Sequence, residues 1–585
     1  MADRDGGYII AEQLRERGVE YLFTLCGGHI SPILVGSKNL GIDVVDVRDE
    51  ASAVFAADAV ARMTGNVGVA AVTAGPGVTN TVTAVKNAQM AQSPVLVLGG
   101  ATATILRGRG SLQDIDQMSL MKPIVKWCTR VTTVKALGPT IKKALDVATS
   151  GVPGPVFVEV PIDLLYPEEI VRGWYLEEAG LDDPKTLLAK GAQLGMKAYL
   201  ARQFHQPHIS VDLSPPSVDL PFGKSLDAKL DKAADALARA EKPVLVVGNQ
   251  TLVNMNQRQA REVAEAIEML GIPVWLGGMA RGLLGRDSDI QFFHKRTASL
   301  KKCDYAIVAG FPFDFRLGYG RKISSKATLV SANLSEEDLT KNRKPDIPLQ
   351  MHPGEFLIRL AERMGGGKRS WDLWFGEIRE REEKRNADID ARATEGEELV
   401  HPIYFFKRLE ELMGDNAVIA VDGGDFVATG AYVLRPRQPL NWLDPGVFGT
   451  LGVGGGFALG GALCRPDSEI WLIWGDGSSA YSLAEFDTYI RHGLAPIAVV
   501  GTDASWAQIA RDQTVILEDD VGTCLRHTEY HKVAEGYGGK GILVTDEAEV
   551  DDAIKEAQKL ASEGVPVLIN LHLAPSDFRK GSISV

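Results

Sequence analysis

Two acidic residues each end a short apolar segment in the last third of the chain. Asp476 lies in the motif Gly-Asp-Gly-Ser at residues 475–478, directly after the apolar segment 470–474. Asp503 follows the next apolar segment, and a helix is expected between the two, over residues 481–492. The strands of such a strand–turn–helix–strand unit are parallel, and their carboxyl ends meet at one edge of the sheet. The two carboxylates are therefore expected to face each other there.

The types of these residues indicate a metal-bound diphosphate. Hard oxygen ligands beside a Gly-rich turn that opens a helix are typical of Mg2+ holding a diphosphate, although an isolated Gly-Asp-Gly is more often a simple tight turn. Gly475, Gly477 and Ala480 also fit a loose dinucleotide fingerprint. In that site Asp476 would lie against a pyrophosphate and repel it unless a cation intervened. Asp476 therefore favours a metal–diphosphate site over a nicotinamide site.

Composition narrows the class of protein. A chain of 585 residues is expected to form about three domains, and a hydrophobic content of 45% is enough for large cores. A net charge of −13 without a basic block argues against nucleic acid as the main partner. No apolar stretch is long enough to span a bilayer and the first residues lack a secretory signal, so we expect a cytoplasmic protein without a membrane partner. The five cysteines have no CxxC spacing and are expected to be reduced thiols.

The order of helix-like and apolar segments predicts an α/β fold with mainly parallel sheets. Three consecutive α/β domains are expected, at residues 1–185, 224–360 and 400–585. A proline-rich stretch at 206–222 indicates a linker, and a charge run at 377–398 indicates a solvated helix or a linker. The outer two domains resemble each other in the alternation of helix-like and apolar segments. Strands are expected at residues 21–25, 67–73, 94–98, 156–160, 242–248, 272–276, 305–310, 327–331, 418–421, 470–474, 497–500 and 567–569.

A second group of residues suited to chemistry lies in the first domain. Glu50 ends a predicted strand and opens an Ala-rich helix over residues 51–62. The helix dipole favours a carboxylate at that position, so on its own Glu50 is best interpreted as a capping acid. A Gly-Pro-Gly turn at 75–77 ends the next strand and either brings backbone close to a flat ligand or is only a turn.

Together these motifs carry a family resemblance over essentially the whole chain. Glu50 before the Ala-rich helix, the turn at 75–80, and Gly-Asp-Gly-Ser followed by a second ligand resemble the thiamine-diphosphate enzymes of the acetolactate synthase and oxalyl-CoA decarboxylase superfamily. The resemblance implies a pyrimidine-binding, a middle Rossmann-like and a diphosphate-binding domain, in that order. It is closest to the acetolactate-synthase-like 2-hydroxyacyl-CoA lyases, as indicated by residues 25–32, 86–93 and 448–456.

The resemblance implies roles for the residues of the first domain. Thiamine diphosphate supplies a C2 ylid that adds to a carbonyl. Glu50 is expected to hydrogen-bond N1′ of the aminopyrimidine and so promote deprotonation of C2. His29 is expected as an acid/base group, although a lone loop histidine is more often structural, and Gln113 is expected to polarise a carbonyl. In this family the two domains that share a cofactor come from different subunits, so a homodimer or homotetramer is expected.

The resemblance also implies the metal ligands: Asp476, Asp503 and the backbone carbonyl of Ser505. Asp503 departs from the family, which usually has Asn there, and its extra negative charge should hold a metal more firmly. The family places a bulky aliphatic residue under the cofactor, where this chain aligns Gly454, with Val453 as the alternative. The expected cofactor-binding residues are Gly28, Glu50, Pro76, Asn80, Asp422, Gly423, Gly424, Gly452, Val453, Gly454, Gly475, Asp476, Gly477, Ser478, Asp503, Ser505 and Trp506.

The middle domain has neither a GxGxxG motif nor a phosphate loop. In relatives it binds ADP, FAD or the nucleotide part of CoA, so ADP or CoA is the expected ligand. Arg281, Arg316 and Asn333 are candidates to contact phosphate or ribose, but for each residue alone a charged or polar surface position is the better explanation. The terminal tail is most simply frayed, but in CoA-using relatives such tails close over the substrate, and Arg579 and Lys580 suit phosphate.

The expected reaction is thiamine-diphosphate- and Mg2+-dependent cleavage of a 2-hydroxyacyl-CoA to formyl-CoA and an aldehyde, with the reverse condensation also possible. Acetolactate synthase, which acts on a 2-oxo acid, and oxalyl-CoA decarboxylase are the alternative enzymes. A non-catalytic nucleotide- or CoA-binding scaffold is the alternative from another class. Glu50, Asp476 and an oxygen ligand at position 503 argue against the scaffold.

Overall fold

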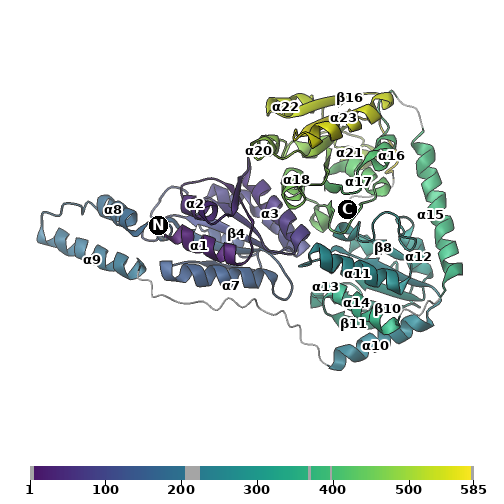
Figure 1. Cartoon of the computed structure of the whole chain (residues 1–585), viewed down its shortest axis with the longest axis horizontal. Helices are drawn as coiled ribbons and strands as arrows, with labels where there is room; N and C mark the ends of the chain where they lie inside the picture. Colours follow the sequence, from purple (N-terminus) through teal and green to yellow (C-terminus); the bar gives the residue numbers. More distant parts are fainter. Residues whose placement is uncertain (1–4, 205–223, 366–369, 395–397, 581–585) are drawn as a thin grey trace. The chain divides into compact units, whose positions relative to one another are not determined.

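The computed structural model describes residues 5–204, 224–365, 370–394 and 398–580. Within these ranges every strand pair is parallel, and the strands form sheets of six, five and six strands. The chain separates into two compact units: the first contains the N-terminal sheet, and the second contains the other two sheets (Figure 1). The predicted α/β class with three parallel sheets is confirmed.

The first sheet has the strand order β2-β1-β3-β4-β6-β5. Every residue of β3, β4 and β6 is buried, as a parallel sheet with helices on both faces requires. A Cβ on Gly68 of β3 would lie 1.9 Å from the Ala57 carbonyl oxygen, so glycine lets helix α3 approach the sheet closely. The elements are β1 (Tyr21–Leu25), β2 (Asp43–Asp46), β3 (Gly68–Val72), β4 (Val95–Ala101), β5 (Trp127–Arg130), β6 (Val156–Pro161), α1 (Gly6–Glu16), α2 (Ser31–Asn39), α3 (Glu50–Thr64), α4 (Pro76–Asn80), α5 (Val82–Ala91), α6 (Gln117–Met121), α7 (Leu137–Thr149), α8 (Glu168–Glu178) and α9 (Leu187–Phe204).

The middle sheet has the order β11-β10-β9-β7-β8, which is the flavodoxin-like arrangement. Its helix α11 begins with a capping box of Asn256 and Gln259 and ends at Gly271 in the left-handed region, so both ends of the helix are satisfied locally. The elements are β7 (Pro243–Val247), β8 (Val274–Leu276), β9 (Tyr305–Ala309), β10 (Thr328–Asn333), β11 (Ile347–Gln350), α10 (Lys224–Arg239), α11 (Gln257–Leu270), α12 (Arg296–Lys302), α13 (Glu336–Thr340), α14 (Pro353–Met364) and α15 (Asp372–Arg392).

The third sheet has the order β13-β12-β14-β15-β17-β16. When the strands of each sheet are numbered from one, this order is the same as in the first sheet. The similar alternation of segments in the outer two domains therefore reflects a shared topology. The elements are β12 (Val418–Asp422), β13 (Trp442–Leu443), β14 (Ile470–Gly475), β15 (Ile497–Thr502), β16 (Lys540–Val544), β17 (Val567–His572), α16 (Pro402–Leu412), α17 (Gly424–Val433), α18 (Val453–Cys464), α19 (Asp476–Ser479), α20 (Glu485–Arg491), α21 (Ala507–Leu517), α22 (Tyr530–Gly536) and α23 (Val550–Ser562).

One local expectation needs correction. The helix expected over 481–492 begins only at Glu485, and Gly-Asp-Gly-Ser itself supplies the first helical turn, α19. Of the two alternatives for the charge run at 377–398, the helix holds, because most of the run lies in the long helix α15, seen at one side of Figure 1. The expected linker at 206–222 lies outside the described residues. None of the helices in the described ranges is both long enough and apolar enough to cross a bilayer.

The strand order locates the places where ligands bind. In each outer sheet the second strand along the chain lies on one side of the first strand, and the third strand lies on the other side. The strand order therefore reverses between β1 and β3 in one sheet and between β12 and β14 in the other. Ligands of open α/β sheets bind at such switch points, outside the carboxyl ends of the strands. The segments that begin at Cys26, Thr73, Gly423 and Asp476 follow these four strands. They contain the residues that the sequence singles out.

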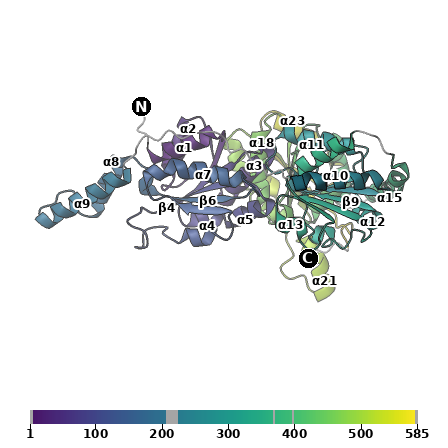
Figure 2. The same ribbon diagram turned by 90° about the horizontal axis from the view of Figure 1, so that it is seen from below.

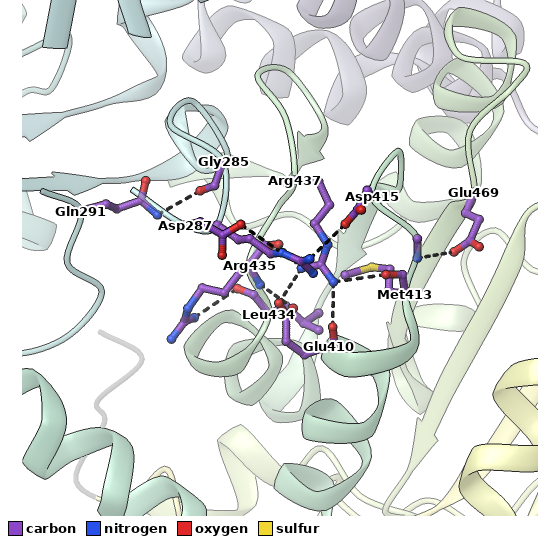
Figure 3. Close-up of polar contacts among 12 residues, drawn as sticks. Gly285, Asp287, Gln291, Glu410, Met413, Asp415, Leu434, Arg435, Arg437 and Glu469 are labelled. Atoms are coloured by element: carbon purple, nitrogen blue, oxygen red, sulfur yellow. Dashed lines mark hydrogen bonds and ion pairs between the residues drawn. The ribbon is translucent and has the colours of Figure 1, made fainter. Parts of the chain in front are cut away.

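A buried arginine fixes the chain between α17 and β13 (Figure 3). The Arg437 side chain is only 2% exposed and forms an ion pair with Glu410 of α16. It also donates hydrogen bonds to the carbonyl oxygens of Met413 and Arg435, at 3.3 and 2.6 Å. The two Nη atoms thus have partners while the buried Nε has none among the described residues, and these charge-assisted bonds hold the loop on α16.

Candidate active site

Glu50 begins α3 and is only 6% exposed. Its Oε2 accepts a hydrogen bond from Nδ2 of Asn80, at 3.0 Å. Its Oε1 faces Gly77: a Cβ on Gly77 would lie 3.5 Å from this oxygen. The last residue of α4 thus orients one carboxylate oxygen, while glycine keeps the turn backbone close to the other.

The Gly-Pro-Gly turn packs against the segment that carries Gln113. Gly75 has φ +62°, and its N–H donates to Oε1 of Gln117 at 2.8 Å. A Cβ on Gly75 would lie 2.8 Å from the carbonyl oxygen of Gln113, which itself has φ +63°. The structure therefore brings Gln113 beside the turn that holds Glu50.

His29 lies at the switch point of the first sheet, in the loop after β1. Its Nδ1 is 3.2 Å from Oγ1 of Thr73, which follows β3. Burial lowers the pKa of His29, which favours the neutral imidazole. The neighbouring Gly28 carbonyl oxygen accepts a hydrogen bond from the Tyr166 hydroxyl, at 3.0 Å. The loops after β1 and β3 therefore support each other.

Asp476 and Asp503 meet at the switch point of the third sheet. Oδ1 of Asp476 accepts the Gly477 N–H at 2.8 Å, whereas Oδ2 is buried without a hydrogen-bond partner. Oδ1 of Asp503 accepts the Ser505 N–H at 3.1 Å. Burial raises the pKa of Asp476 to about 6, and burial together with the charge of Asp476 raises the pKa of Asp503 to about 7.

These two carboxylates fit a hard divalent cation. A cation between them would remove their mutual repulsion and would give the buried Oδ2 of Asp476 a partner. No group of three or more His, Cys, Asp or Glu side chains that could hold a metal occurs among the described residues. A complete ligand shell would therefore need backbone or non-protein oxygens beside the two acids, and Ser505 lies within the same loop.

The loop of Asp503 has an unusual backbone. Ala504 adopts φ +55°, a left-handed conformation that costs a non-glycine residue about 1 kcal/mol. Trp506 follows it, and its ring would lie 2.4 Å from a Cβ on Gly477. Only glycine at 477 permits this contact, so Trp506 both packs on the Gly-Asp-Gly-Ser turn and lines the adjacent cavity.

A cavity of about 270 Å³ lies over the Gly-Asp-Gly-Ser turn. Gly423 and Gly424 have φ +69° and +89°, and a Cβ on Gly475 would lie 3.0 Å from the Gly423 carbonyl oxygen. The two loops approach so closely that side chains are excluded, which leaves backbone groups to contact an occupant. The predicted residues that line this cavity are Gly424, Gly475, Asp476, Gly477, Ser478, Asp503, Ser505 and Trp506.

Asp422 contacts helix α18 and does not line this cavity. It is fully buried and accepts hydrogen bonds from Gly452 N at 3.1 Å and Gly454 N at 2.8 Å. Burial raises the pKa of Asp422 to about 7. A Cβ on Gly454 would lie 2.2 Å from Nε1 of Trp474, and Val453 is fully buried. Asp422 therefore fixes the start of α18.

Leu451 is a cavity residue that the sequence reasoning missed. It lies two residues before the start of α18 and lines the cavity, and its Cδ2 would lie 2.4 Å from a Cβ on Gly423. Of the aliphatic side chains at 451 and 453, Leu451 lines the cavity and Val453 does not. The available signal was its place between Gly449 and Gly452, because flanking glycines leave a large side chain free to project.

The ion pairs of Asp425 are a second missed feature, and they include Arg579, which the sequence indicated as a phosphate contact. Asp425 of α17 pairs with Arg511 of α21 at 2.6 Å and with Arg579 at 3.8 Å. The sequence offers no signal for the Asp425–Arg511 pair, since the residues are far apart in the chain. The pair links α17 and α21 at the edge of the cavity, and Arg579 adds the C-terminal segment to this contact.

Comparisons with known proteins match the whole chain. Models of thiamine pyrophosphate enzymes match residues 4–120 (N-terminal TPP binding domain), 230–360 (central domain) and 422–571 (C-terminal TPP binding domain). 2-Hydroxyacyl-CoA lyase 2 of Danio rerio is 49% identical over 592 residues, covering 100% of this chain and 94% of the relative. The chain belongs to the thiamine pyrophosphate enzyme family. The predicted membership is confirmed, and with it thiamine diphosphate as the cofactor.

Other relatives of this thiamine pyrophosphate enzyme have two different names. 2-Hydroxyacyl-CoA lyase 2 of Homo sapiens is 45% identical, covering 100% of this chain and 92% of the relative. A probable acetolactate synthase of Mycobacterium bovis is 31% identical, covering 97% of this chain and 96% of the relative. The higher identity is to the lyase.

The enzyme also has a strongly basic cavity of about 1060 Å³ at the carboxyl ends of the middle strands. Burial, with help from Arg281 and Arg316, lowers the pKa of Arg296 to about 10. The cations that line it are Arg281, Lys295, Arg296, Lys301, Arg316, Arg385, Arg392 and Lys580, and Asp577 is the acid that lines it. So many cations in one cavity favour a ligand with several negative charges.

The predicted middle-domain candidates differ in their surroundings. Arg281 donates to the Ala431 carbonyl oxygen at 2.8 Å, and Arg316 is paired with Asp314 at 2.6 Å. Asn333 is fully buried at the end of β10, where its Nδ2 donates to Gln250 at 2.7 Å. Asn333 does not line the basic cavity, whereas both arginines do.

The described part of the C-terminal segment is packed. Phe578 is 9% exposed and lies edge-on to Tyr432, with ring centroids 5.5 Å apart. The Arg385 guanidinium lies 4.9 Å from the Phe578 ring, and Arg392 pairs with Asp577 at 2.6 Å. These contacts hold the segment between the basic cavity and α17, and residues 581–585 lie outside the described residues.

Proposed function

We propose that this enzyme is an Mg2+-dependent carbon–carbon lyase that cleaves a 2-hydroxyacyl-CoA to formyl-CoA and an aldehyde and also catalyses the reverse condensation. The observation that carries the proposal is the basic cavity of about 1060 Å³, which suits the phosphates of a CoA ester. A free 2-oxo acid such as pyruvate has no group that needs such a cavity. The lyases among the relatives act on a CoA ester by name.

A series of adjoining cavities supports this substrate. CoA is long, so its nucleotide and its thioester must occupy separate places. The basic cavity adjoins one of about 960 Å³, which adjoins one of about 380 Å³, which adjoins the diphosphate cavity. The basic cavity shares Arg392, Asp577 and Lys580 with the cavity of about 960 Å³. That cavity shares Arg511, Pro575 and Ser576 with the one of about 380 Å³. The last shares Asp425, Phe426, Asp503, Ser505 and Ala507 with the diphosphate cavity.

In this proposal the C-terminal segment lies along the path of the CoA ester. Lys580 would contact phosphate in the basic cavity, and Arg281 and Arg316 would add positive charge there. Arg579 holds the segment to Asp425 at the other end of the path. ADP is the alternative occupant of the basic cavity, because it offers the same diphosphate chemistry.

The residues of the two switch points have separate tasks. Bound thiamine diphosphate supplies a carbanion equivalent at C2 that adds to and stabilises acyl groups. Asp476, Asp503 and the Ser505 carbonyl would hold Mg2+ and through it the diphosphate. Glu50, oriented by Asn80, would hydrogen-bond the aminopyrimidine.

Two further groups would act on the substrate. Neutral His29 can accept a proton at a ring nitrogen or return it, which suits the hydroxyl proton of the substrate. The side-chain amide of Gln113 would donate a hydrogen bond to the carbonyl oxygen. Assembly as a homodimer or homotetramer belongs to the proposal, because enzymes of this family share one cofactor between two subunits.

The function is tested with three substrates in parallel. The enzyme with Mg2+ and thiamine diphosphate is incubated with a 2-hydroxyacyl-CoA, oxalyl-CoA or pyruvate, and formyl-CoA, CO2 and acetolactate are measured. The proposal expects formyl-CoA and an aldehyde from the first substrate. Rapid formation of acetolactate without turnover of either CoA ester would identify a synthase, and CO2 from oxalyl-CoA alone would identify a decarboxylase.

Glu50→Gln distinguishes an enzyme from a binding scaffold. The amide cannot support the acid–base task of the carboxylate, so turnover should fall by at least about 100-fold while thiamine diphosphate still binds. Glu16→Gln, on the exposed end of α1, is the matched control. Undiminished turnover in Glu50→Gln would contradict the assigned role of this residue.

A further inference from the structure

A turn at residues 520–525 contacts the loop that carries the predicted metal ligands Asp503 and Ser505. The turn follows helix α21, which projects from the second unit in Figure 2. Ser505 and Cys524 form an isolated antiparallel β-bridge, so the turn runs alongside residues 503–506, called the metal loop below. Thr523 is only 3% exposed, although the residues on either side of it are exposed. A buried residue within an exposed turn indicates a specific contact.

Three hydrogen bonds join the turn to the metal loop. The carbonyl oxygen of Thr523 accepts the Trp506 N–H at 2.8 Å and the Ser505 hydroxyl at 3.3 Å. The Leu525 N–H donates to the carbonyl oxygen of Ala504 at 2.8 Å. These bonds engage two successive peptide groups of the loop, so they restrict its backbone and not only a side chain.

The hydrogen bond from Trp506 determines where the Ser505 carbonyl points. The Trp506 N–H and the Ser505 C=O belong to one trans, planar peptide group, so they point in opposite directions. Because the N–H is directed to Thr523, the carbonyl oxygen is directed away from the turn. This carbonyl is the predicted third protein ligand of Mg2+, and Ser505 lines the diphosphate cavity. The direction of a predicted ligand therefore depends on Thr523.

The metal loop needs such support because Ala504 has φ +55°. A left-handed alanine is unfavourable and persists only where the surrounding contacts hold it. The Leu525 N–H holds the Ala504 carbonyl on one side, and Oδ1 of Asp503 accepts the Ser505 N–H on the other. The turn thus helps to maintain a conformation that the loop alone would leave.

The turn is itself firmly closed. Oγ1 and the backbone N–H of Thr523 both donate to the carbonyl oxygen of Asp520, at 2.7 and 3.0 Å. Gly522, between them, has φ +77°, which glycine adopts without strain. Nε2 of Gln513 in α21 donates to the Val521 carbonyl oxygen at 2.9 Å. A closed turn that is tied to a helix can hold the Thr523 carbonyl in one place.

A buried amide fixes the chain after the turn to the strand that leads to Asp503. Asn570 of β17 is fully buried, and its Nδ2 donates to the Thr528 carbonyl oxygen at 2.9 Å. Its Oδ1 accepts the hydroxyl of Thr502, the last residue of β15, at 2.7 Å. The segment that follows the turn and the start of the metal loop are therefore attached to the same side chain.

We propose that the turn at residues 520–525 is a positioning element for Mg2+, which fixes the metal loop through Thr523 and Leu525 so that the Ser505 carbonyl stays available to the cation. The inference rests on the Mg2+ site of the proposed function and adds residues that need to touch neither metal nor substrate. Without the turn, the loop would relax from the left-handed conformation at Ala504, and Mg2+ would lose a protein ligand.

Two pairs of matched variants test the turn. Gly522→Ala disfavours φ +77° at a position where a Cβ meets no described atom within 4 Å, so it changes only the backbone preference. Gly564→Ala makes the same change at φ +84° in the turn after α23, again with no described atom within 4 Å. Thr523→Val removes the hydroxyl that closes the turn. Thr251→Val removes a hydroxyl that donates to a backbone carbonyl from a buried threonine of the middle domain.

Calorimetric Mg2+ titrations of the full-length protein, with saturating thiamine diphosphate and no substrate, provide the measurement. Gly522→Ala and Thr523→Val should each raise the Kd for Mg2+ about fivefold, the effect expected from one weakened hydrogen bond. The control variants should lower the melting temperature of the metal-free protein by similar amounts and leave this Kd unchanged. An unchanged Kd in both turn variants, or an equal rise in the controls, would overturn the inference.

A rescue variant separates positioning of the loop from general damage. Ala504→Gly removes the cost of the left-handed conformation, so the loop should need the turn less. The double variant Gly522→Ala, Ala504→Gly should therefore recover most of the Mg2+ affinity that Gly522→Ala loses. If the fivefold weaker binding persists in the double variant, the turn does not act through the metal loop and the inference fails.

These titrations need no turnover, so they separate the inference from the proposed reaction. Weaker Mg2+ binding in the two turn variants supports the positioning role even if the enzyme makes no formyl-CoA from a 2-hydroxyacyl-CoA, a result that would refute only the reaction. Equal Mg2+ binding in all variants refutes the positioning role even if the lyase reaction is observed.

Discussion

Asp503 determines the charge of the metal site. Its carboxylate lies close enough to Asp476 that the charge of Asp476, together with burial, disfavours ionisation of Asp503 when no cation is bound. Asp503→Asn should therefore stabilise the metal-free protein and weaken Mg2+ binding by about one order of magnitude, because one charge facing the cation is lost. Calorimetric Mg2+ titrations in the presence of thiamine diphosphate measure the second effect.

The exposed Asp519→Asn, in the loop after α21, is the control for this change in charge. Superimposable Mg2+ titrations of the parent and Asp503→Asn would mean that the carboxylate has no advantage over the amide usual in the family. A lower melting temperature of the metal-free variant would contradict the repulsion between the two acids.

His29 makes stability depend on pH on the acidic side. Its pKa is lowered by burial in the folded state, so the unfolded chain binds more protons as the pH falls through the ordinary histidine value of about 6.5. The contribution of His29 to stability is thus present above that pH and is lost below it. His29→Gln should show a smaller loss of stability between pH 7.5 and 5 than the parent, by urea unfolding. Equal losses would argue against neutral His29.

The position of single residues at strand ends was largely predictable, but their packing was not. Asp476 and Asp503 could be placed at one edge of the sheet because each follows an apolar parallel strand, and their role as metal ligands stays a prediction. Leu451 and Arg511 required the fold, since their functions depend on which side chains lie opposite them. Asp422 illustrates the limit, because its carboxylate is directed to the start of α18 by hydrogen bonds that the sequence does not reveal.

At the scale of elements, we expect the C-terminal segment to contribute to substrate binding, with Phe578 holding it in place. Phe578→Ala removes a buried ring and should lower the free energy of unfolding of the second unit by about 3 kcal/mol. It should also raise the KM for the acyl-CoA, while the thiamine diphosphate concentration needed for activity stays the same. Steady-state kinetics and urea unfolding measure these effects.

Leu373→Ala is the control, because this side chain of α15 is 92% exposed. An unchanged KM in a destabilised Phe578→Ala enzyme would mean that the segment is only structural. A parallel rise in the thiamine diphosphate requirement would indicate damage that extends to the diphosphate cavity.

Elements were predictable where they are buried and apolar. The central strands β3, β9 and β14 coincide with apolar segments because parallel strands covered on both faces need them. The edge strands β5 and β16 were missed, since their residues are largely exposed or half-buried and give no continuous apolar run. Helices α8 and α9 were also missed.

For the whole molecule, cofactor and metal should stabilise the protein together. A ligand that binds only the folded state at 100 times its Kd adds about 2.7 kcal/mol to the free energy of unfolding. We expect thiamine diphosphate with Mg2+ to raise the melting temperature, and thiamine diphosphate with EDTA to have little effect because Asp476 and Asp503 then repel the diphosphate. Scanning calorimetry measures both. An equal rise with EDTA, or protection by NAD instead, would contradict the metal–diphosphate site.

The two outer sheets share one strand order although they use it for different chemistry. Six parallel strands can be ordered in many ways, so the same order twice in one chain points to the duplication of an ancestral α/β domain. After the duplication one copy carried its acid at the start of a helix, as Glu50, and the other acquired acids after two strands, as Asp476 and Asp503. The two halves of a cofactor site would then descend from a single switch point, and the topology preserves that history where the residues have diverged.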